Sequence, residues 1–222
     1  MLNPPPEIIV VDFDAGNLRS VQRALEAVGQ QARVTSDARE VERAHALVLP
    51  GVGSAQDSMR KLRRLGLVEP LRAYAASGRP FLSVCVGMQL LFDWSEEGGG
   101  VKCLGILPGT VRLFKSEQVK VPQIGWNQVW KTFDHPLLEG IPGGSYFYFV
   151  HSYYVEPSET HITLGQAEYG IDFAAIVARQ NVVATQFHPE KSADVGLRLY
   201  RNFGRISARA EQGDRLPAHT RG

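Results

Sequence analysis

A single cysteine stands where an apolar strand gives way to a helix. Residues 80–86 are almost wholly apolar, and Gly87 with the Met-Gln-Leu-Leu run after it begins a helical pattern. A thiol at such a turn points outward from the end of a sheet, and the free N–H groups of the helix start favour its thiolate. Gly87 lacks the Cβ that would obstruct a tight turn. Cys85 is therefore a candidate nucleophile, and the alternative is a small, buried, apolar side chain.

A histidine and a glutamate flank a proline far downstream, in the segment His188-Pro189-Glu190. Proline fixes its own φ and disfavours helix at the residue before it, so this segment is predicted to be extended. Residues i and i+2 of an extended segment point the same way, which lets the Glu190 carboxylate bind one imidazole nitrogen. The other nitrogen is then free to take the proton of the Cys85 thiol. Alone, the pair is equally compatible with a solvent-facing His and Glu after an edge strand.

A glycine-rich turn follows another predicted strand, at residues 50–54 (Pro-Gly-Val-Gly-Ser). Ligands of α/β proteins bind at the carboxyl ends of parallel strands. The backbone N–H groups of this turn are placed to form an oxyanion hole together with the N–H of Val86. No Gly-Lys-Ser/Thr follows, which argues against a phosphate loop. An ordinary βα turn is the structural alternative.

The elements that must position these residues alternate along the first half of the chain. Buried parallel strands are predicted over residues 7–12, 32–35, 46–50 and 80–86. Helices are predicted from Leu18 to Val28, after a cap at Ser36 or Asp37, and from Met59 through to Tyr74. This alternation predicts an α/β fold with a mostly parallel sheet flanked by helices on both faces.

The pattern becomes rich in strands and turns after about Gly98. Further strands are predicted at residues 110–114, 128–130, 146–150 and 181–186, and a last helix over residues 193–206. We expect a single domain over residues 1–206 and a flexible polar tail over residues 207–222, which lacks apolar spacing.

Composition excludes several classes of function. The 222 residues carry a formal net charge of +1 without a long basic run, so a nucleic-acid partner is not expected. No apolar stretch approaches the ~18 residues of a membrane helix, and the first residues do not read as a signal peptide. Two cysteines without a C-x-x-C pair indicate a reducing, cytoplasmic setting. The six histidines show no zinc spacing, and we expect neither a metal nor a cofactor.

The motifs at residues 50–53, 85–89 and 187–192 resemble those of the triad (class I) glutamine amidotransferases. Asp12, residues 16–20 (Gly-Asn-Leu-Arg-Ser), residues 125–127 (Gly-Trp-Asn) and residues 148–154 are similar to the glutaminase subunits of imidazole glycerol phosphate synthases. The match runs from about Glu7 to Arg205. The resemblance implies a flavodoxin-like fold, a mostly parallel sheet flanked by helices with additional antiparallel strands.

The resemblance also implies an activity and a partner. Glutamine would be hydrolysed to glutamate and ammonia, and the ammonia passed to a (β/α)₈-barrel cyclase subunit in a heterodimer, which makes imidazole glycerol phosphate and an aminoimidazole-carboxamide ribotide in histidine biosynthesis. Each residue role carried over from the family is an expectation. These are Cys85, His188 and Glu190 as the catalytic triad, Gly53 and Val86 as the oxyanion hole, Gln89, Glu97, His151, Ser152 and Tyr153 as the glutamine pocket, and Asn17, Gly125, Trp126 and Asn127 as the partner interface.

Several alternatives remain open at this point. The chain is also compatible with a triad amidotransferase of another pathway, with a stand-alone cysteine hydrolase, or with a catalytically silent binding subunit. The silent subunit is suggested by Ser83, which stands where the family usually has glycine before the nucleophile. For Trp126 the structural alternative is a core aromatic, and for His151 a hydrogen-bonded structural histidine.

Overall fold

Five parallel strands form the centre of the sheet in the computed structural model, which describes residues 6–115, 117 and 119–213. They lie in the order β2-β1-β3-β4-β13, so the predicted mostly parallel sheet is confirmed. The residues of these strands are buried, except in β2, which lies at the edge. The strands are β1 (Ile8–Val11), β2 (Ala32–Thr35), β3 (Ala46–Leu49), β4 (Phe81–Val84) and β13 (Val182–Thr185).

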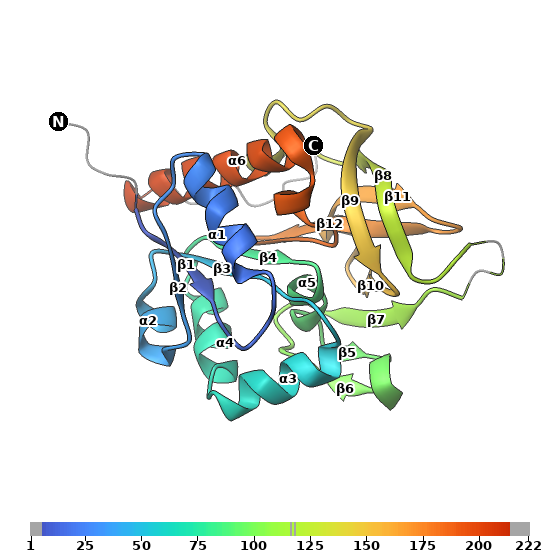
Figure 1. Cartoon of the computed structure of the whole chain (residues 1–222), viewed down its shortest axis with the longest axis horizontal. Helices are drawn as coiled ribbons and strands as arrows, with labels where there is room; N and C mark the ends of the chain where they lie inside the picture. The colour runs from blue at the N-terminus through green and yellow to red at the C-terminus, as the bar shows by residue number, and fades with distance from the viewer. Residues whose placement is uncertain (1–5, 116, 118, 214–222) are drawn as a thin grey trace.

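Helices cover both faces of this parallel half. In Figure 1, α1 and α6 lie above the strands, whereas α2, α3 and α4 lie below them. Each amphipathic helix turns an apolar stripe toward the sheet; α1, for example, buries Val21, Ala24 and Leu25. The helices are α1 (Leu18–Ala27), α2 (Ala38–Arg43), α3 (Ala55–Arg64), α4 (Val68–Ala76), α5 (Val86–Leu90) and α6 (Ala193–Glu211).

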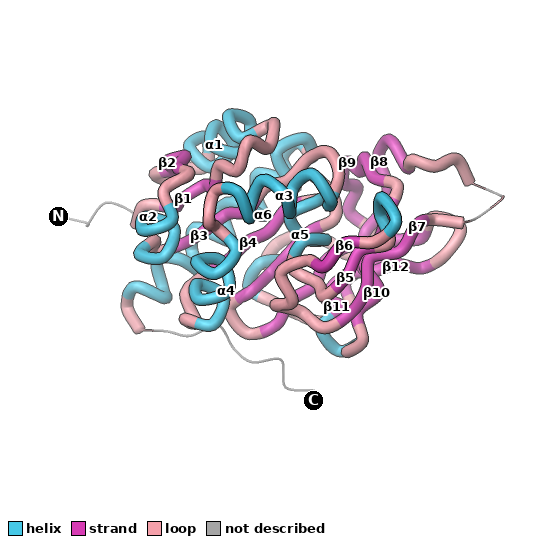
Figure 2. Tube along the Cα trace, turned by 90° about the horizontal axis from the view of Figure 1, so that it is seen from below, coloured by secondary structure: helices cyan, strands magenta, loops and turns pink. Residues whose placement is uncertain are grey.

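Antiparallel strands extend the sheet beyond β13. Figure 2 shows the helices gathered at one end of the molecule and these strands at the other. The order continues β13-β12-β10-β7-β5-β6, and β11 pairs with both β12 and β8, which pairs with β9. The added strands are β5 (Trp94–Ser95), β6 (Val101–Lys102), β7 (Gly109–Leu113), β8 (Gln123–Lys131), β9 (Ser145–His151), β10 (Tyr153–Pro157), β11 (Thr163–Glu168) and β12 (Asp172–Arg179). Short 3₁₀ turns lie at η1 (Glu97–Gly99), η2 (Pro136–Leu138), η3 (Thr160–Ile162) and η4 (Pro189–Lys191).

Two helix predictions differ from the structure. The helix expected from Met59 to Tyr74 is two helices, because Gly66 adopts a positive φ of 66° and ends the first. The last helix does not end at residue 206 but runs to Glu211, and Ser207 is buried, with its hydroxyl donating to Phe203 O at 2.9 Å. Residues 207–211, which were predicted to begin the flexible tail, therefore belong to this helix. Residues 214–222 of the expected tail lie outside the described part of the chain.

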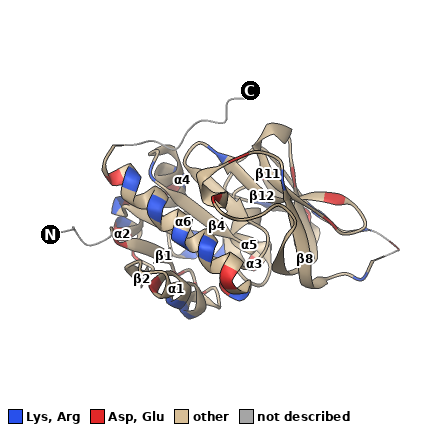
Figure 3. Ribbon diagram, turned by 90° about the horizontal axis from the view of Figure 1, so that it is seen from above, with Lys and Arg blue, Asp and Glu red and all other residues tan. Residues whose placement is uncertain are grey.

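Charge is unevenly spread over the surface. Figure 3 shows basic positions in blue along the ribbon of α6, and the helix carries four exposed arginines, Arg198, Arg201, Arg205 and Arg209. Among the described residues, no helix combines the length and the apolar character needed to cross a membrane.

Candidate active site

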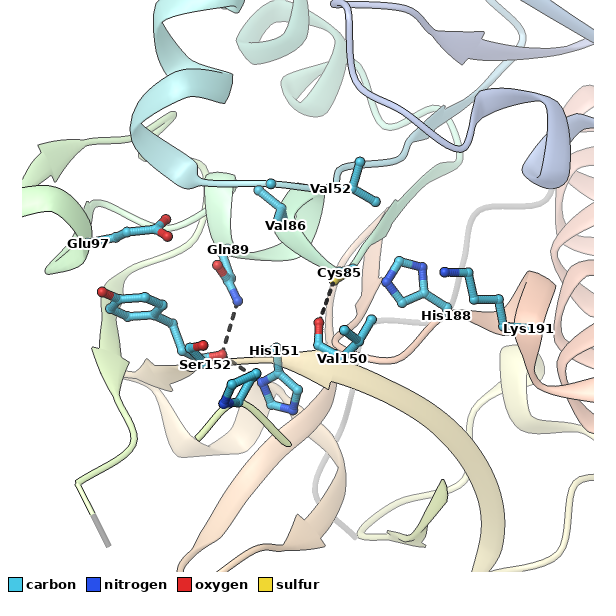
Figure 4. Close-up of a pocket in the computed structure, with 13 residues that line it drawn as sticks. Val52, Cys85, Val86, Gln89, Glu97, Val150, His151, Ser152, His188 and Lys191 are labelled. Atoms are coloured by element: carbon cyan, nitrogen blue, oxygen red, sulfur yellow. Dashed lines mark hydrogen bonds between the residues drawn. The ribbon is translucent and has the colours of Figure 1, made fainter. Parts of the chain in front are cut away.

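The topology brings the chemistry-bearing turns to one edge. Strands β1, β3, β4 and β13 run parallel and lie side by side, so the turns after them meet at the carboxyl edge of the sheet. There they border a cavity of about 430 Å³. Figure 4 shows Cys85 and His188 side by side at this cavity, with Gln89 and Glu97 across from them. The cavity is lined by Val52, Gly53, Cys85, Val86, Gln89, Glu97, Pro122, Val150, His151, Ser152, Tyr153, His188 and Lys191.

Cys85 sits on a sharp turn between β4 and α5. Its φ of 55° and ψ of −115° are unusual for a residue with a side chain, and such strain is typical of a nucleophile turn. The sheet holds this backbone in place, because the Cys85 N–H donates to Thr185 O at 2.7 Å. The residue is 2% exposed, and its sulfur faces the cavity.

Glycines make this turn possible. A Cβ on Gly87 would collide with Leu49 O and would lie 2.8 Å from Ser83 Oγ, and a Cβ on Gly51 would lie 2.5 Å from Gly87 N. Ser83 fits its wholly buried position because its hydroxyl donates to Leu49 O at 3.1 Å. The serine before the nucleophile is thus accommodated without opening the turn.

His188 and Glu190 form a buried pair beside the cysteine. Glu190 Oε1 lies 2.7 Å from His188 Nδ1, and the two side chains are 0% and 2% exposed, respectively. The prediction of a fully extended segment is wrong, because the chain turns through the 3₁₀ helix η4 after His188. Proline is at ease at the first position of such a turn, where no N–H is needed. The carboxylate reaches the imidazole through this turn instead of by strand alternation.

The second imidazole nitrogen faces the sulfur. Among the described residues, His188 Nε2 is buried and has no hydrogen bond of ordinary geometry within the chain. Burial alone would lower the pKa of His188. The neighbouring Cys85 sulfur and the Glu190 carboxylate outweigh burial and raise this pKa from 6.5 to about 10. A protonated imidazole held by a carboxylate can stabilise a thiolate and give a proton to a leaving group.

Two donors from other elements complete the surroundings of the glutamate. Asn17 Nδ2 donates to Glu190 Oε1, and the Tyr200 hydroxyl donates to Oε2 at 3.2 Å. Asn17 was expected at the partner interface, whereas no sequence pattern indicated Tyr200. Their contacts arise because the β1–α1 turn and α6 both pack against η4, a tertiary arrangement that no local pattern encodes.

The expected oxyanion donors lie at the cavity but are not ready to act. Val86 and Gly53 both line it. The Val86 N–H, however, donates to Gly51 O at 3.3 Å. A backbone carbonyl thus occupies the N–H group that was predicted to bind a substrate oxyanion.

The expected glutamine-binding residues all line the cavity. The Gln89 amide is held by Tyr153 O at 3.0 Å and Gln186 Oε1 at 3.1 Å. Burial raises the pKa of Glu97, whose Oε2 accepts from the Ala55 N–H at the start of α3. An acidic side chain in a cavity of this size suits a ligand that carries an ammonium group.

His151 has a structural role within this wall. Its Nδ1 lies 2.7 Å from Tyr153 O and its Nε2 lies 2.8 Å from the Gln123 side-chain amide. Burial lowers its pKa to about 4, so the ring is neutral. The ring shapes the turn between β9 and β10 that carries Ser152.

Gln186 is a site residue that the sequence analysis missed. It follows β13 directly, and its wholly buried side chain reaches toward the cysteine, with Nε2 3.9 Å from Cys85 Sγ. A signal existed, because Gln186 is two residues before His188 and an extended chain turns both side chains to one face.

The expected interface residues on β8 lie away from the cavity lining. Trp126 is 51% exposed and packs edge-on against Tyr148 of β9, so it is not a core aromatic. Gly125 has a φ of 137°, and Asn127 Nδ2 donates to Glu168 O at 2.7 Å. In the part of the chain that the structure describes, no cluster of three or more His, Cys, Asp or Glu side chains is arranged to hold a metal ion.

Comparison with known proteins agrees with this geometry. Residues 9–205 match the family model of class I glutamine amidotransferases. The chain is 48% identical over 200 residues to the imidazole glycerol phosphate synthase subunit HisH of Dehalococcoides mccartyi strain CBDB1, covering 90% of this chain and 97% of that protein. It is 49% identical over 203 residues to the HisH subunit of Chloroflexus aurantiacus, covering 90% of this chain and 96% of that protein.

Solved structures share the fold at much lower identity. A glutamine amidotransferase crystal structure matches with a TM-score of 0.70 and 21% identity, covering 90% of this chain and 98% of that chain. The structure of PurLQS from Thermotoga maritima matches with a TM-score of 0.70 and 17% identity, covering 90% and 97%. These likenesses support the predicted architecture, a parallel sheet between helices with antiparallel strands added.

Proposed function

We propose that Cys85, His188 and Glu190 hydrolyse glutamine, because the chain belongs to the class I glutamine amidotransferases. Within that family it belongs to the HisH subunits of imidazole glycerol phosphate synthase, which act in histidine biosynthesis. The observation that carries the proposal is the buried line of three groups. Glu190 binds one imidazole nitrogen of His188, and the other nitrogen faces the Cys85 sulfur. This order of nucleophile, base and orienting carboxylate is what acyl transfer requires.

The proposed reaction has two halves. The Cys85 thiolate attacks the side-chain carbonyl carbon of glutamine, and the C=O electron pair moves onto oxygen. His188 then gives its Nε2 proton to the amide nitrogen as the C–N bond breaks, which releases ammonia and leaves a γ-glutamyl thioester. Water attacks the thioester and passes a proton to His188, the C–S bond breaks, and glutamate leaves with the thiolate restored. Glu190 keeps the imidazole in the right tautomer throughout.

We propose that Val86 and Gly53 hold the oxyanion after a rearrangement of the turn between β3 and α3. Gly51 O must first leave the Val86 N–H that it now occupies. Gly53, with a φ of 88° and no heavy atom within 4 Å of a built Cβ, gives this turn room to change. Each donor delivered to the oxyanion is worth about 3 kcal/mol in the barrier.

We propose that the cavity binds the amino-acid end of glutamine away from the cysteine. Glu97 is suited to the α-ammonium group, because its carboxylate is half-buried and faces the cavity. Gln89, Ser152 and Tyr153 offer polar groups for the remainder of the substrate, and His151 holds the Ser152 turn. The three-carbon side chain then reaches the sulfur.

We propose that the released ammonia passes to a (β/α)₈-barrel cyclase subunit docked at this edge of the sheet, giving imidazole glycerol phosphate and an aminoimidazole-carboxamide ribotide. The outer face of the β8–β9 ribbon supports this, since Ile124, Trp126 and Tyr146 are more than half exposed. Exposed apolar patches of this kind mark interaction surfaces. The same face continues through Val150 into the cavity. Asn17, Gly125 and Asn127 are the proposed neighbours of this contact.

A cytoplasmic location is part of the proposal. Both cysteines of the chain, Cys85 and Cys103, are free thiols, and a catalytic thiolate requires a reducing compartment.

The test of the triad is glutamine hydrolysis by the assembled synthase. Cys85→Ala is expected to abolish glutamate and ammonia production, while ammonia added from outside still supports the cyclase. A diazo-ketone analogue of glutamine should label the wild-type subunit once, at Cys85. Cys103→Ala is the matched control, because Cys103 is also buried but lies away from the cavity, and it should keep full activity. Substantial glutaminase activity in the Cys85→Ala enzyme would overturn the nucleophile assignment.

A further inference from the structure

The Glu190 carboxylate is completely buried, which makes its partners decisive. An unpaired buried carboxylate is strongly disfavoured, so such a group stays ionised only where several donors bind it. Three donors surround it: His188 Nδ1 and Asn17 Nδ2 share Oε1, and the Tyr200 hydroxyl binds Oε2. The pKa of Tyr200 is raised well above its ordinary value by burial and by the glutamate, so the hydroxyl keeps its proton and donates.

Asn17 reaches the glutamate at the expense of its own helix. It stands at the N-cap of α1, where an asparagine side chain normally accepts from a backbone N–H and contributes about 1 kcal/mol. Here the side chain makes no such bond. Its backbone is left-handed, with a φ of 73° and a ψ of 6°, a conformation that asparagine tolerates better than most residues. The helix start is therefore arranged around a contact outside the helix.

The turn that carries Asn17 is anchored from the opposite side. Lys61 of α3 donates to Asp14 O at 2.9 Å, and Arg64 forms an ion pair with the Asp14 carboxylate. The Asn17 carbonyl also accepts from the N–H groups of Ser20 and Val21. Both the backbone and the side-chain amide of Asn17 are thus fixed relative to η4.

We propose that Asn17 is a positioning residue of the glutaminase reaction, which fixes the Glu190 carboxylate so that His188 keeps the orientation and the charge that Cys85 needs. The inference rests on the proposed triad. Asn17 and His188 bind the same oxygen, Glu190 Oε1. The carboxylate therefore cannot rotate about its side-chain bonds without breaking both hydrogen bonds. The Asn17 donor also stabilises the negative charge on Glu190, and that charge in turn supports the imidazolium.

The groups that titrate around Glu190 are few. Its contacts include His188 on the same segment and Tyr200 on α6, and Cys85 lies beyond the imidazole. Lys191 follows it in the chain and extends over the Tyr148 ring of β9. Asn17 is the contact from α1 and carries no charge, so it changes the pH response of the others without titrating itself.

Two variants of Asn17 separate positioning from simple space-filling. Asn17→Gly keeps the backbone relaxed, because glycine adopts a positive φ freely, and it removes the amide. Asn17→Asp keeps the size and replaces the donor by a second carboxylate, and two carboxylates sharing a site cannot both ionise easily. Gln22→Ala is the matched control: it removes another amide of α1, which bonds Glu26 and Ala32 O instead of the triad.

Two quantities are measured between pH 5.5 and 9. The first is kcat/KM for glutamine in the assembled synthase, and the second is the rate of Cys85 alkylation by iodoacetamide in the free subunit. Losing a hydrogen bond to a charged group costs about 10- to 100-fold, so Asn17→Gly should lower kcat/KM by that factor. The acid limb of both profiles should move upward by about one pH unit in Asn17→Gly, and further in Asn17→Asp. Tyr200→Phe should move it in the same direction.

The result that overturns the inference is a parallel fall at every pH with an unchanged alkylation profile, which would make Asn17 a contact of the partner only. Unaltered rates in Asn17→Asp would also overturn it. Should Asn17→Gly lose its fold by circular dichroism, the Asn17→Asp and Tyr200→Phe profiles decide. The underlying triad is tested apart from this by Cys85→Ala, since residual activity there refutes the triad whatever the Asn17 variants do.

Discussion

Replacing Gly87 by alanine tests the turn that presents the thiol. The added methyl group would meet two obstacles, the Leu49 carbonyl on β3 and the Ser83 hydroxyl at 2.8 Å, and both are closer than the 3.0 Å that real Cβ atoms keep. The carbonyl belongs to the pairing of β3 with β4 and accepts from Ser83, so it cannot simply swing away. The start of α5, with Cys85, must therefore move.

The cost follows from these contacts. Overpacking a rigid site costs up to about 3 kcal/mol. Alanine recovers about 1 kcal/mol because it is a better helix former than glycine, which leaves a net loss of about 2 kcal/mol in the free energy of unfolding. Relief of the clash takes a movement of about 1 Å, and misplacing a catalytic group by that much lowers kcat on the order of a hundredfold.

Urea denaturation and glutaminase kinetics measure the two effects separately. Gly143→Ala is the matched control, because its Cβ would meet only the Trp130 ring at an ordinary 3.8 Å. Its stability should stay within about 0.5 kcal/mol of the parent. Ser83→Gly added to Gly87→Ala should restore little, since the Leu49 carbonyl remains. A Gly87→Ala enzyme with the stability and kcat of the parent would refute the account of this turn.

Three further predictions concern the neighbouring groups. The pKa of His188 is raised from 6.5 to about 10, so the stability that its charged form contributes is complete below pH 6.5 and is lost as the pH rises through about 10. Between pH 6 and pH 10, the urea concentration at half-unfolding should therefore fall less steeply in His188→Gln than in the parent. Glu97→Gln is expected to raise the KM for glutamine by about tenfold or more with a smaller effect on kcat, because the half-buried charge is lost while the Ala55 N–H keeps an acceptor; equal KM values would contradict the proposed ammonium site. Trp126→Ala should weaken binding to the cyclase, measured by titration calorimetry, by about 2 kcal/mol or more, while Trp130→Ala, an equally exposed ring at the far end of β8, should leave the affinity unchanged.

Local patterns predicted the parallel half of the fold well. The strands at β1, β2, β3 and β4 lie within one or two residues of their predicted ranges, because uninterrupted β-branched runs have few alternatives to a buried strand. Asp37 caps α2 as expected, accepting from the N–H groups of Arg39 and Glu40. The position of Cys85 at the end of β4 followed from the same periodicity.

Tertiary contacts explain what the sequence did not predict. Strands β10, β11 and β12 have no strong alternation of their own and depend on neighbouring strands for their pairing. The bond from Val86 to Gly51 joins two turns that are remote in sequence. The break between α3 and α4 was missed because the apolar spacing continues across Gly66, and only its positive φ ends the helix.

If the chain acts as proposed, the hydrogen bond from the Val86 N–H to Gly51 O also bears on when glutamine is hydrolysed. Every glutamine molecule hydrolysed outside the proposed assembly would discard a nitrogen atom. While Gly51 O occupies that donor, charge on a bound amide would find no stabilisation there, and the free subunit would spare the amino acid. Docking that turns a single peptide group would then be enough to start ammonia production where it is consumed.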